Sequence, residues 1–448
     1  MKLTYGINDR PAFGKTIVYA LQQLLAIMTA TLVVPIIIGH DMSSAAALFG
    51  AGVGTLVYLL FTRLKSPVFL GSSFAFIGSM TAAFAGAVST SVGYLGLIMG
   101  AVFAGLVYVV ISIIVKLVGA GWVNKLMPAV VIGPTVAIIG LSLAGNAIGD
   151  LQKAPAGGSS LIAVLCGIVT LFVTIICSTV GSKNIKLIPF IIGILAGYVF
   201  SALLTIIGYA SGSDALLISD FSSFTALTAD GVKLSTFIQV PSFTFVTAFG
   251  AFGDLSAAYV GTVAVAYVPV AFVVFAEHIA DHKNISSIIE KDLLEEPGLN
   301  RTLLGDGVGS MAGAFFGGCP NTTYGESIAC VAISGNASVI TICTTAVLAI
   351  IISFISPFVA FVNSIPSCVM GGVCVALYGF IAVSGLKMIQ KVNLEENRNL
   401  FVVSTILITG IGGLVLQFGK VTITSVACAL ILGILVNVML SALEKKAK

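Results

Sequence analysis

Residues 70–79 read LGSSFAFIGS, and residues 320–327 read PNTTYGES. Each stretch interrupts an apolar segment with glycine and small polar residues, which favour turns and unwound backbone over a continuous helix. Within a membrane, unwound backbone is tolerated only where it lines a cavity or is buried in protein. The composition of the whole chain decides whether these two stretches lie in a membrane.

The chain is too apolar for a water-soluble protein. Hydrophobic residues make up 58% of its 448 positions and charged residues only 9%, whereas an average soluble domain carries about 25% charged residues. A water-soluble fold could not cover so much apolar sequence with polar surface. We therefore expect an all-α polytopic membrane protein.

Fourteen segments have the length and hydrophobicity of a bilayer-spanning helix, which needs about 20 apolar residues. They lie at about 15–39, 45–62, 68–86, 93–115, 128–147, 160–181, 186–208, 256–280, 302–318, 321–334, 337–361, 366–388, 399–418 and 421–443. The third and tenth segments contain the two interrupted stretches, and the ninth is also short and rich in glycine.

The distribution of basic residues supports this count. With the N-terminus placed in the cytoplasm, 18 of the 21 Lys and Arg residues fall in cytoplasmic segments, and 3 fall outside: Lys153, Lys233 and Lys420. Cytoplasmic loops of membrane proteins carry such an excess of Lys and Arg. We therefore expect a multi-pass inner-membrane protein with both termini in the cytoplasm.

The two halves of seven spans resemble each other faintly. Pro128 and Pro366 begin the fifth and twelfth spans, and each is followed five residues later by a glycine, Gly133 or Gly371. The third span of each half is the interrupted one. Because seven is an odd number, two such halves insert with opposite orientations. Interrupted segments at matching places are typical of a transporter site at the repeat interface.

Only two acidic residues, Glu277 and Glu326, are expected within spans, because most others lie in polar loops. A charge at the bilayer centre costs at least about 2.5–3.5 kcal/mol on insertion scales, so such residues usually face a cavity and have a function. Asp281 lies one turn after Glu277 and projects from the same helix face. The structural alternatives are a helix-end carboxylate that reaches the headgroups for Glu277 and a helix N-cap for Glu326.

The interrupted stretches themselves supply hydrogen-bonding groups. Ser73 and Phe74 on one side can face Tyr324 and Gly325 on the other, with free backbone N–H groups between them. Carboxylates accept hydrogen bonds from ring N–H groups, and backbone N–H groups donate to ring carbonyls, so an uncharged amide-like ring suits this site. The alternative interpretation is close helix packing through small residues.

Other classes of protein are disfavoured. Three histidines without Cys or Asp at ligand spacing argue against a metal site, and no cofactor is expected. His278 is expected to be either an interfacial histidine or a proton relay, whereas His40 and His282 are expected in loops. The chain has no G-x-x-x-x-G-K-[ST] loop for ATP, no soluble domain to hold an enzyme's site, and no feature that indicates a nucleic-acid partner.

Four stretches resemble the nucleobase–ascorbate transporter family, and most closely its bacterial uracil permease branch. They are AEH at 276–278, NTTYGE at 321–326, GSSFAF at 71–76 and LQQLLA-xxx-ATLVVP at 21–35. The similarity runs along nearly the whole chain, and the combination of motifs is specific.

The resemblance implies a fold of fourteen spans in two inverted seven-span repeats, with a short strand in the third and in the tenth span. Spans 1–4 and 8–11 would form a core domain, residues 1–125 and 241–363. Spans 5–7 and 12–14 would form a gate domain, residues 126–240 and 364–448. The substrate would lie between the two strands, and the protein would be a homodimer.

The resemblance also assigns roles to individual residues. Glu277 matches the carboxylate that holds the base, and Glu326 matches the one that grips its other edge. Phe74 and Gly325 match positions whose backbone N–H groups meet the ring carbonyls. Asp281 occupies a position that is His in some uracil permeases and Asp in purine-transporting relatives.

Some residues depart from the uracil permease pattern. Gln23 stands where uracil permeases often carry a histidine, and the Asn-x-Gly that usually follows Glu326 is replaced by Ser327-x-Ala329. With Asp281, these changes leave a xanthine or other purine carrier open as an alternative. Glu326 favours uracil, because purine transporters of the family often have Gln there.

The sequence thus predicts a proton-coupled nucleobase symporter, with uracil as the preferred substrate. A sulfate-type anion transporter shares the architecture, but a carboxylate at Glu277 would repel its ligand. A neutral base brings no charge, so a coupled proton would make its transport respond to the membrane potential. We expect Glu277 to carry that proton, alone or shared with Asp281, and Glu326 is the alternative carrier.

The charge distribution generates a test of the topology. Reporter fusions placed near Lys233 and at Lys448 should report opposite sides of the membrane, because the positive-inside rule puts Lys233 outside and the C-terminus inside. Alkaline phosphatase and fluorescent-protein fusions at both sites measure this. Two reporters on the same side would show that the span count is wrong.

Overall fold

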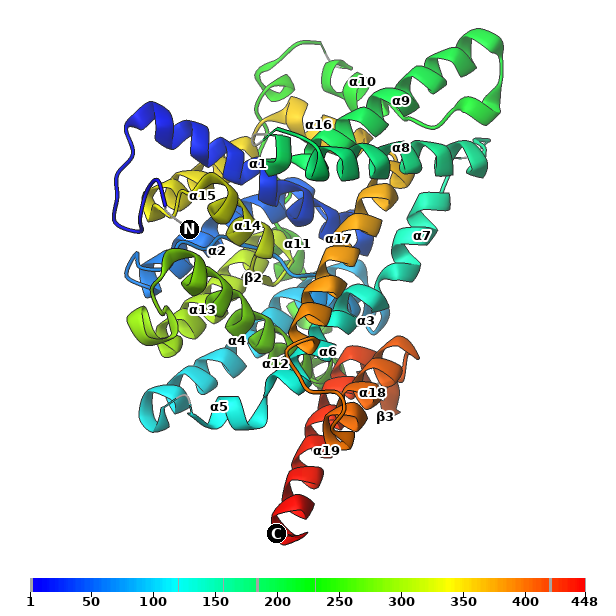
Figure 1. Ribbon diagram of the computed structural model, residues 1–448. Helices are drawn as coiled ribbons and strands as arrows, with labels where there is room; N and C mark the ends of the chain where they lie inside the picture. The colour runs from blue at the N-terminus through cyan, green and yellow to red at the C-terminus, as the bar shows by residue number, and fades with distance from the viewer. Residues whose placement is uncertain are drawn as a thin grey trace.

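The computed structural model describes residues 3–119, 121–155, 157–182, 185–229, 231–418 and 421–447. It is mostly helical (Figure 1). The first half contains α1 (Phe13–Ile38), α2 (Ser44–Phe61), β1 (Leu70–Ser72), the 3₁₀ turn η1 (Phe74–Phe76), α3 (Ile77–Ala85), α4 (Thr90–Val118), α5 (Gly121–Leu126), α6 (Ala129–Ser142), α7 (Ala144–Gln152), α8 (Ser160–Thr179) and α9 (Pro189–Ser211).

The segment between the halves carries two short α-helices, α10 (Ser222–Thr228) and α11 (Thr244–Ala248), and three 3₁₀ helices, η3 (Asp214–Leu216), η4 (Leu234–Thr236) and η5 (Phe249–Asp254). The second half contains α12 (Ala257–Ile289), α13 (Leu299–Gly317), β2 (Asn321–Thr323), α14 (Gly325–Ser334), α15 (Val339–Ile352), α16 (Ser356–Ser364), α17 (Ser367–Ile389), α18 (Asn397–Ile411), β3 (Leu416–Phe418), β4 (Val421–Ile423) and α19 (Ser425–Ala447).

The predicted spans correspond to these elements. Within the described residues, nine segments are long and apolar enough to cross a bilayer, and four shorter apolar helices lie at further predicted spans. The glycine-rich α13 occupies the ninth predicted span. The predicted fold class, with strands in the broken third and tenth spans, is therefore confirmed.

Some predicted spans are less regular than expected. The fifth is divided at Leu143 into α6 and α7, and the eleventh is divided into α15 and α16. The thirteenth and fourteenth are joined by the β3–β4 hairpin, in which Leu416 pairs with Ile423. Three consecutive β-branched residues at 421–423 favour a strand over the start of a helix.

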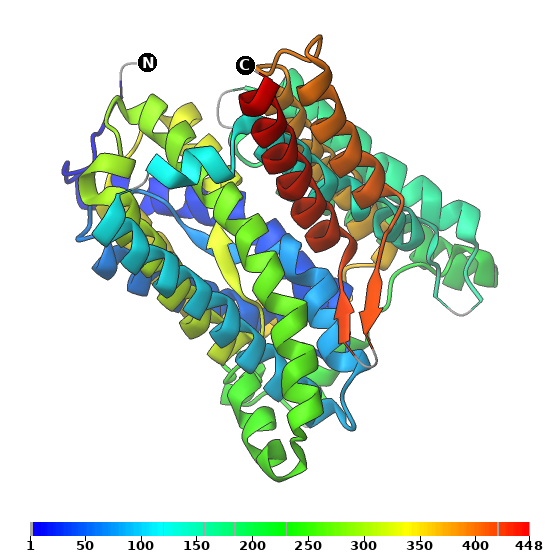
Figure 2. The ribbon, with the colours of Figure 1, turned by 90° about the horizontal axis from the view of Figure 1, so that it is seen from below.

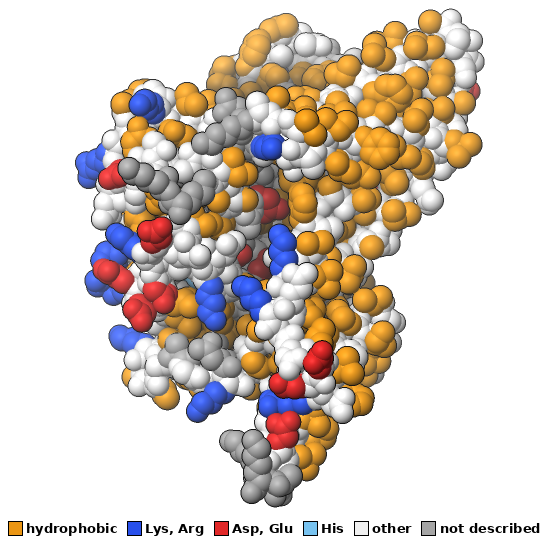
Figure 3. All heavy atoms as spheres, viewed as in Figure 1, with side chains coloured by type: hydrophobic (Ala, Val, Ile, Leu, Met, Phe, Trp, Pro, Cys, Tyr) orange, Lys and Arg blue, Asp and Glu red, His pale blue; other side chains and the backbone are white. Residues whose placement is uncertain are grey.

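The surface fits a membrane environment. In the face drawn in Figure 3, hydrophobic side chains cover the part formed by α8 and α9, whereas Lys and Arg gather elsewhere. Exposed residues of these two helices include Leu161, Phe172, Ile176, Val199 and Leu203. An apolar surface of this kind is stable against lipid and would aggregate in water.

Loops that the charge pattern assigns to the cytoplasm lie together in the structure. The N-terminal segment bonds to the end of α14, with the Thr4 N–H donating to the Gly335 carbonyl at 2.7 Å. Lys65, after α2, forms an ion pair with Glu296, before α13. This ion pair lowers the pKa of the Glu296 carboxyl group. The grouping agrees with the predicted topology, and the side of the membrane remains a prediction.

The strands β1 and β2 meet in the interior (Figure 2). They pair antiparallel, with Leu70 opposite Thr323 and Ser72 opposite Asn321. The Ser73 N–H extends the ladder by donating to the Pro320 carbonyl at 2.9 Å. The two interrupted segments, far apart in sequence, thereby satisfy each other's backbone groups.

Glycines allow the helices α2 and α13 to pack closely against each other and against this strand pair. A Cβ atom at Gly50 of α2 would lie 2.3 Å from the Gly313 carbonyl oxygen of α13, and one at Gly313 would lie 2.4 Å from Nδ2 of Asn321. The Asn321 amide in turn donates to the Gly50 carbonyl at 3.3 Å. Close approach through small residues is a common way to pack helices in membranes.

The close packing of α2 against α13 predicts how much stability the protein loses when a methyl group is added at Gly50. Gly50→Ala should destabilise the protein by about 1–3 kcal/mol, the usual cost of overpacking, because backbone lies where the Cβ would be placed. Gly261→Ala is the matched control, since a Cβ there meets nothing within 4 Å. Thermal unfolding in detergent should show a lower midpoint for Gly50→Ala alone. Equal midpoints would contradict the close α2–α13 contact.

Candidate functional site

Two short helical segments begin where the paired strands end. Phe74 opens η1, which leads into α3, and Gly325 opens α14. The first N–H groups of a helix have no intrahelical partner, so both starts offer free donors. Gly325 is exposed, and a Cβ there would meet nothing within 4 Å, which marks open space beside it. The structure thus brings together the two segments that the sequence predicted to face each other.

Two carboxylates lie beside these helix starts. Glu277 projects from α12 and Glu326 from the first turn of α14, and both side chains are only partly buried. Glu277 interacts electrostatically with Glu326, Asp281 and Asp306, all of them acidic. Figure 3 shows acidic atoms recessed in a hollow of the molecule. The helix-end alternative does not hold for Glu277, because α12 continues to Ile289, and the N-cap alternative does not hold for Glu326, because the N-cap of α14 is Tyr324.

The Asp281 side chain forms a hydrogen bond with the strand pair. The Thr323 hydroxyl of β2 donates to the Asp281 carboxylate at 2.7 Å. This bond ties α12, one turn beyond Glu277, to the strand pair. The carboxylate therefore has a defined place beside the site.

Tyr324 and Ser73 are both buried, and they differ in their bonding. The Tyr324 hydroxyl donates to the Ser72 carbonyl at 2.8 Å, and its ring covers Gly71, where a Cβ would lie 2.3 Å from ring carbon. The Tyr324 side chain therefore packs against the strand pair and does not project into the open space beside Gly325. The Ser73 hydroxyl has no hydrogen-bond partner among the described residues.

Gln23 of α1 reaches the start of α14. Its amide donates to the Ser327 carbonyl at 3.2 Å and to the Ser327 hydroxyl. The same hydroxyl accepts from the Phe69 N–H at 3.1 Å. The two departures from the uracil permease pattern, Gln23 and Ser327, are therefore bonded to each other next to Glu326.

Helix α17 also contacts the site, through Tyr378. The Phe74 ring lies against the Tyr378 ring of α17, with centroids 5.5 Å apart in an edge-to-face arrangement. The α17 helix thus contacts the start of η1. Sequence reasoning did not single out Tyr378.

One histidine of α12 is not where the sequence placed it. His282 was expected in a loop, yet it is fully buried within α12, as is His278, which was expected at an interface or in a relay. The expectation for His282 was wrong because α12 runs to Ile289, well past the predicted end of its span. His40 does lie in the α1–α2 loop, where its ring stacks on Phe84.

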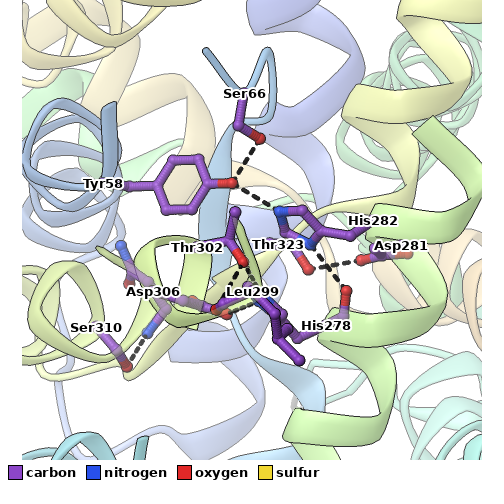
Figure 4. A network of polar contacts seen from close by, with 11 residues as sticks. Tyr58, Ser66, His278, Asp281, His282, Leu299, Thr302, Asp306, Ser310 and Thr323 are labelled. Carbon is purple, nitrogen blue, oxygen red and sulfur yellow. Dashed lines mark hydrogen bonds and ion pairs between the residues drawn. The ribbon is translucent and has the colours of Figure 1, made fainter. Parts of the chain in front are cut away.

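Asp306 was missed by the sequence reasoning. It is fully buried in α13 and bonds to Nδ1 of His278 at 2.7 Å (Figure 4). A signal was present, because an acidic residue flanked by glycines stands inside the predicted ninth span. The expectation that only Glu277 and Glu326 lie within spans was therefore wrong.

The arrangement can recognise an uncharged polar molecule. Carboxylates accept hydrogen bonds and free backbone N–H groups donate them, so the two can read opposite edges of one planar ring. Within the part of the chain that the structure describes, no three His, Cys, Asp or Glu residues are grouped so that they could hold a metal ion.

Comparisons with known proteins identify relatives over nearly the whole chain. Residues 14–418 match a family described as the permease family. The chain is 38% identical to the uracil permease of Bacillus caldolyticus, over 99% of this chain and 96% of that protein. It is 34% identical to the uracil permease of Escherichia coli K12, over 96% of this chain and 92% of that protein.

Solved structures share the fold. The transmembrane domain of the cyanobacterial bicarbonate transporter BicA aligns with a TM-score of 0.61 at 15% identity, covering 96% of this chain and all of that domain. The murine anion transporter Slc26a9 aligns with a TM-score of 0.62 at 10% identity, covering 98% of this chain and 69% of that chain. At such low identity the likeness concerns the fold alone. From the family match and the full-length relatives, together with its own motifs, this chain belongs to the nucleobase–ascorbate transporter family of permeases.

Proposed function

We propose that this protein is a proton-coupled nucleobase symporter whose preferred substrate is uracil. The observation that carries the proposal is the pair of partly buried carboxylates, Glu277 and Glu326, beside the free helix starts at Phe74 and Gly325. The names of the full-length relatives support uracil among the possible bases. A buried acid without a basic partner is expensive in a membrane and usually has a function.

In the proposed binding mode, the base lies between the ends of β1 and β2. Glu277 accepts from ring N–H groups on one edge, and Glu326 accepts from the other edge. The backbone N–H groups of Phe74 and Gly325 donate to the ring carbonyls. Ser73 offers a buried hydroxyl without a partner among the described residues, and Tyr324 holds the strand pair in register.

The coupled proton would reside on Glu277. The carboxylates of Asp281, Glu326 and Asp306 act on it electrostatically, and removing water from a carboxylate beside like charges favours its neutral form. Asp281 can share the proton, in which case the two groups titrate as a pair. Glu326 remains the alternative carrier.

Transport would follow from movement between two parts of the molecule. We propose a core of residues 1–125 and 241–363 and a gate of residues 126–240 and 364–448, assembled as a homodimer in the inner membrane with cytoplasmic termini. Contacts such as Phe74 with Tyr378 would join the two parts and change during the cycle. Broken segments at a repeat interface suit such alternating access.

One observation favours a second substrate class. Asp281 and the Gln23–Ser327 pair depart from the uracil permease pattern, so a xanthine or purine permease is the alternative. An anion substrate is disfavoured despite the shared fold, because two carboxylates would repel it.

Uptake of radiolabelled bases tests the substrate. Cells that express the protein should accumulate uracil saturably, and unlabelled uracil should compete far better than xanthine. The reason is that Glu326 can accept from an N–H group where a purine carrier often has Gln. Cells with the empty vector are the control. Uptake of xanthine in preference to uracil would support the purine alternative.

The substitution Glu277→Gln tests the proton. A membrane potential of about 100 mV supplies about 2.3 kcal/mol per charge, enough for an accumulation of about fifty-fold. Because Gln cannot cycle a proton, this variant should lose accumulation driven by a pH gradient or potential, while exchange of internal for external uracil can continue.

The exposed Glu295, in the segment between α12 and α13, provides the matched control, since Glu295→Gln makes the same chemical change away from the site. Both variants should be measured in proteoliposomes with an imposed pH gradient. If Glu277→Gln still concentrates uracil in response to the gradient, another residue carries the proton.

A further inference from the structure

A buried polar network lies behind Glu277 and is not used by the proposed transport mechanism. It joins α2, α12 and α13 through Tyr58, His282, His278, Thr302 and Asp306 (Figure 4). All five side chains are fully buried. One atom is left over, because Oδ1 of Asp306 has no hydrogen-bond partner among the described residues. Such an orphaned oxygen in an apolar interior is costly, most of all if it is charged.

The hydrogen-bond acceptors around His282 and Tyr58 determine which of their atoms carry protons. Nδ1 of His282 lies 2.8 Å from the His278 carbonyl, which can only accept, so this nitrogen carries a proton. In the neutral ring Nε2 then accepts from the Tyr58 hydroxyl at 2.8 Å. The Tyr58 oxygen in turn accepts from Ser66 at 2.6 Å.

The protons of His278 follow in the same way. The Thr302 hydroxyl donates to the Leu299 carbonyl at 3.1 Å, and in this orientation its oxygen accepts from Nε2 of His278, which lies at 3.0 Å. His278 then carries a proton on Nε2. Its other nitrogen, Nδ1, lies 2.7 Å from Oδ2 of Asp306, and two bare acceptors would repel each other at that distance. One proton must lie between them.

The surroundings decide which atom holds this proton. An ionised Asp306 would leave Oδ1 as an anionic oxygen without a donor. With the proton on His278, the pair would be a carboxylate and an imidazolium, two charges held without water in a fully buried site. The other ionisable neighbours are the Tyr58 and Tyr108 hydroxyls of α2 and α4, which supply no positive charge. The neutral carboxylic acid, which donates to His278, avoids both costs.

We propose that Asp306 and His278 form a neutral positioning pair in which Asp306 keeps its proton throughout the transport cycle. His278 is adjacent to Glu277 in sequence, and the pair fixes α12 against α13. It thereby holds the rotation of α12 that turns Glu277 toward the substrate. The role of the pair in uptake rests on the proposed function, whereas its proton state does not.

The substitution Asp306→Asn tests the proton directly. The amide NH₂ group can replace the acid O–H as donor to Nδ1 of His278, and its carbonyl can replace Oδ1 without change in charge. Uptake and its dependence on pH should therefore stay within about threefold of the native protein, since a preserved hydrogen bond costs little. If Asp306→Asn instead loses gradient-driven accumulation but keeps exchange, Asp306 carries a transported proton and the proposal is overturned.

The substitution His278→Phe tests the positioning. The ring remains, but both hydrogen bonds are lost and Asp306 has no acceptor. The half-saturation concentration for uracil should rise by about tenfold or more, because a small misplacement of a binding group has a large effect. The pH profile should keep its shape. A change in the pH profile with an unchanged half-saturation concentration would contradict a positioning role.

The Asp306→Asn experiment has its own control, Asp254→Asn, which makes the same chemical change at an exposed residue.

A measurement without substrate separates this proposal from the assignment of uracil. The chain has three histidines, so ¹⁵N-histidine labelling in lipid bilayers yields few signals, and the signal lost in His278→Phe identifies His278. It should be singly protonated, on Nε2, from about pH 5.5 to about pH 8, the range in which an ordinary histidine titrates. Double protonation, or a change of state across this range, would overturn the proposal whatever the uptake measurements show.

Discussion

The antiparallel pairing of β1 with β2 is the constraint on which the rest of the structure depends. Both strands lie inside a molecule whose surroundings are lipid, where unpaired N–H and C=O groups cost several kcal/mol each. The two interrupted segments can exist at this depth because each satisfies the other, from Leu70–Thr323 to Ser72–Asn321. The pairing then leaves the N–H groups at the starts of η1 and α14 free to face a ligand.

The helices around the strands meet the demands of this pairing. Gly50 and Gly313 allow α2 and α13 to approach closely enough for Asn321 to bond between them. Glycine at Gly71 leaves room for the Tyr324 ring, whose hydroxyl bonds back to the opposite segment. The high glycine content of the spans thus has a steric cause at these positions.

The acidic residues around Glu277 pose an electrostatic problem. Glu277, Asp281, Glu326 and Asp306 come from three helices, and they interact without a basic partner among them. The structure relieves part of this repulsion by hydrogen bonding. Thr323 donates to Asp281, and His278 shares a hydrogen bond with Asp306. Of the other two acids, Glu326 lies in the first turn of α14, and Glu277 interacts with it electrostatically.

The sequence by itself determined the membrane class, the order of the spans, the two broken segments and the acids Glu277 and Glu326. Each of these depends on a local property, such as the hydropathy of a segment or a charge within it. Only the tertiary structure decided that the broken segments pair as strands, that Gln23 meets Ser327, and that His282 and Asp306 belong to a buried network. In a soluble helix, polar residues mark the face that contacts water. In a membrane, lipid is as apolar as the protein interior, so the sequence of a span does not reveal which of its faces is buried.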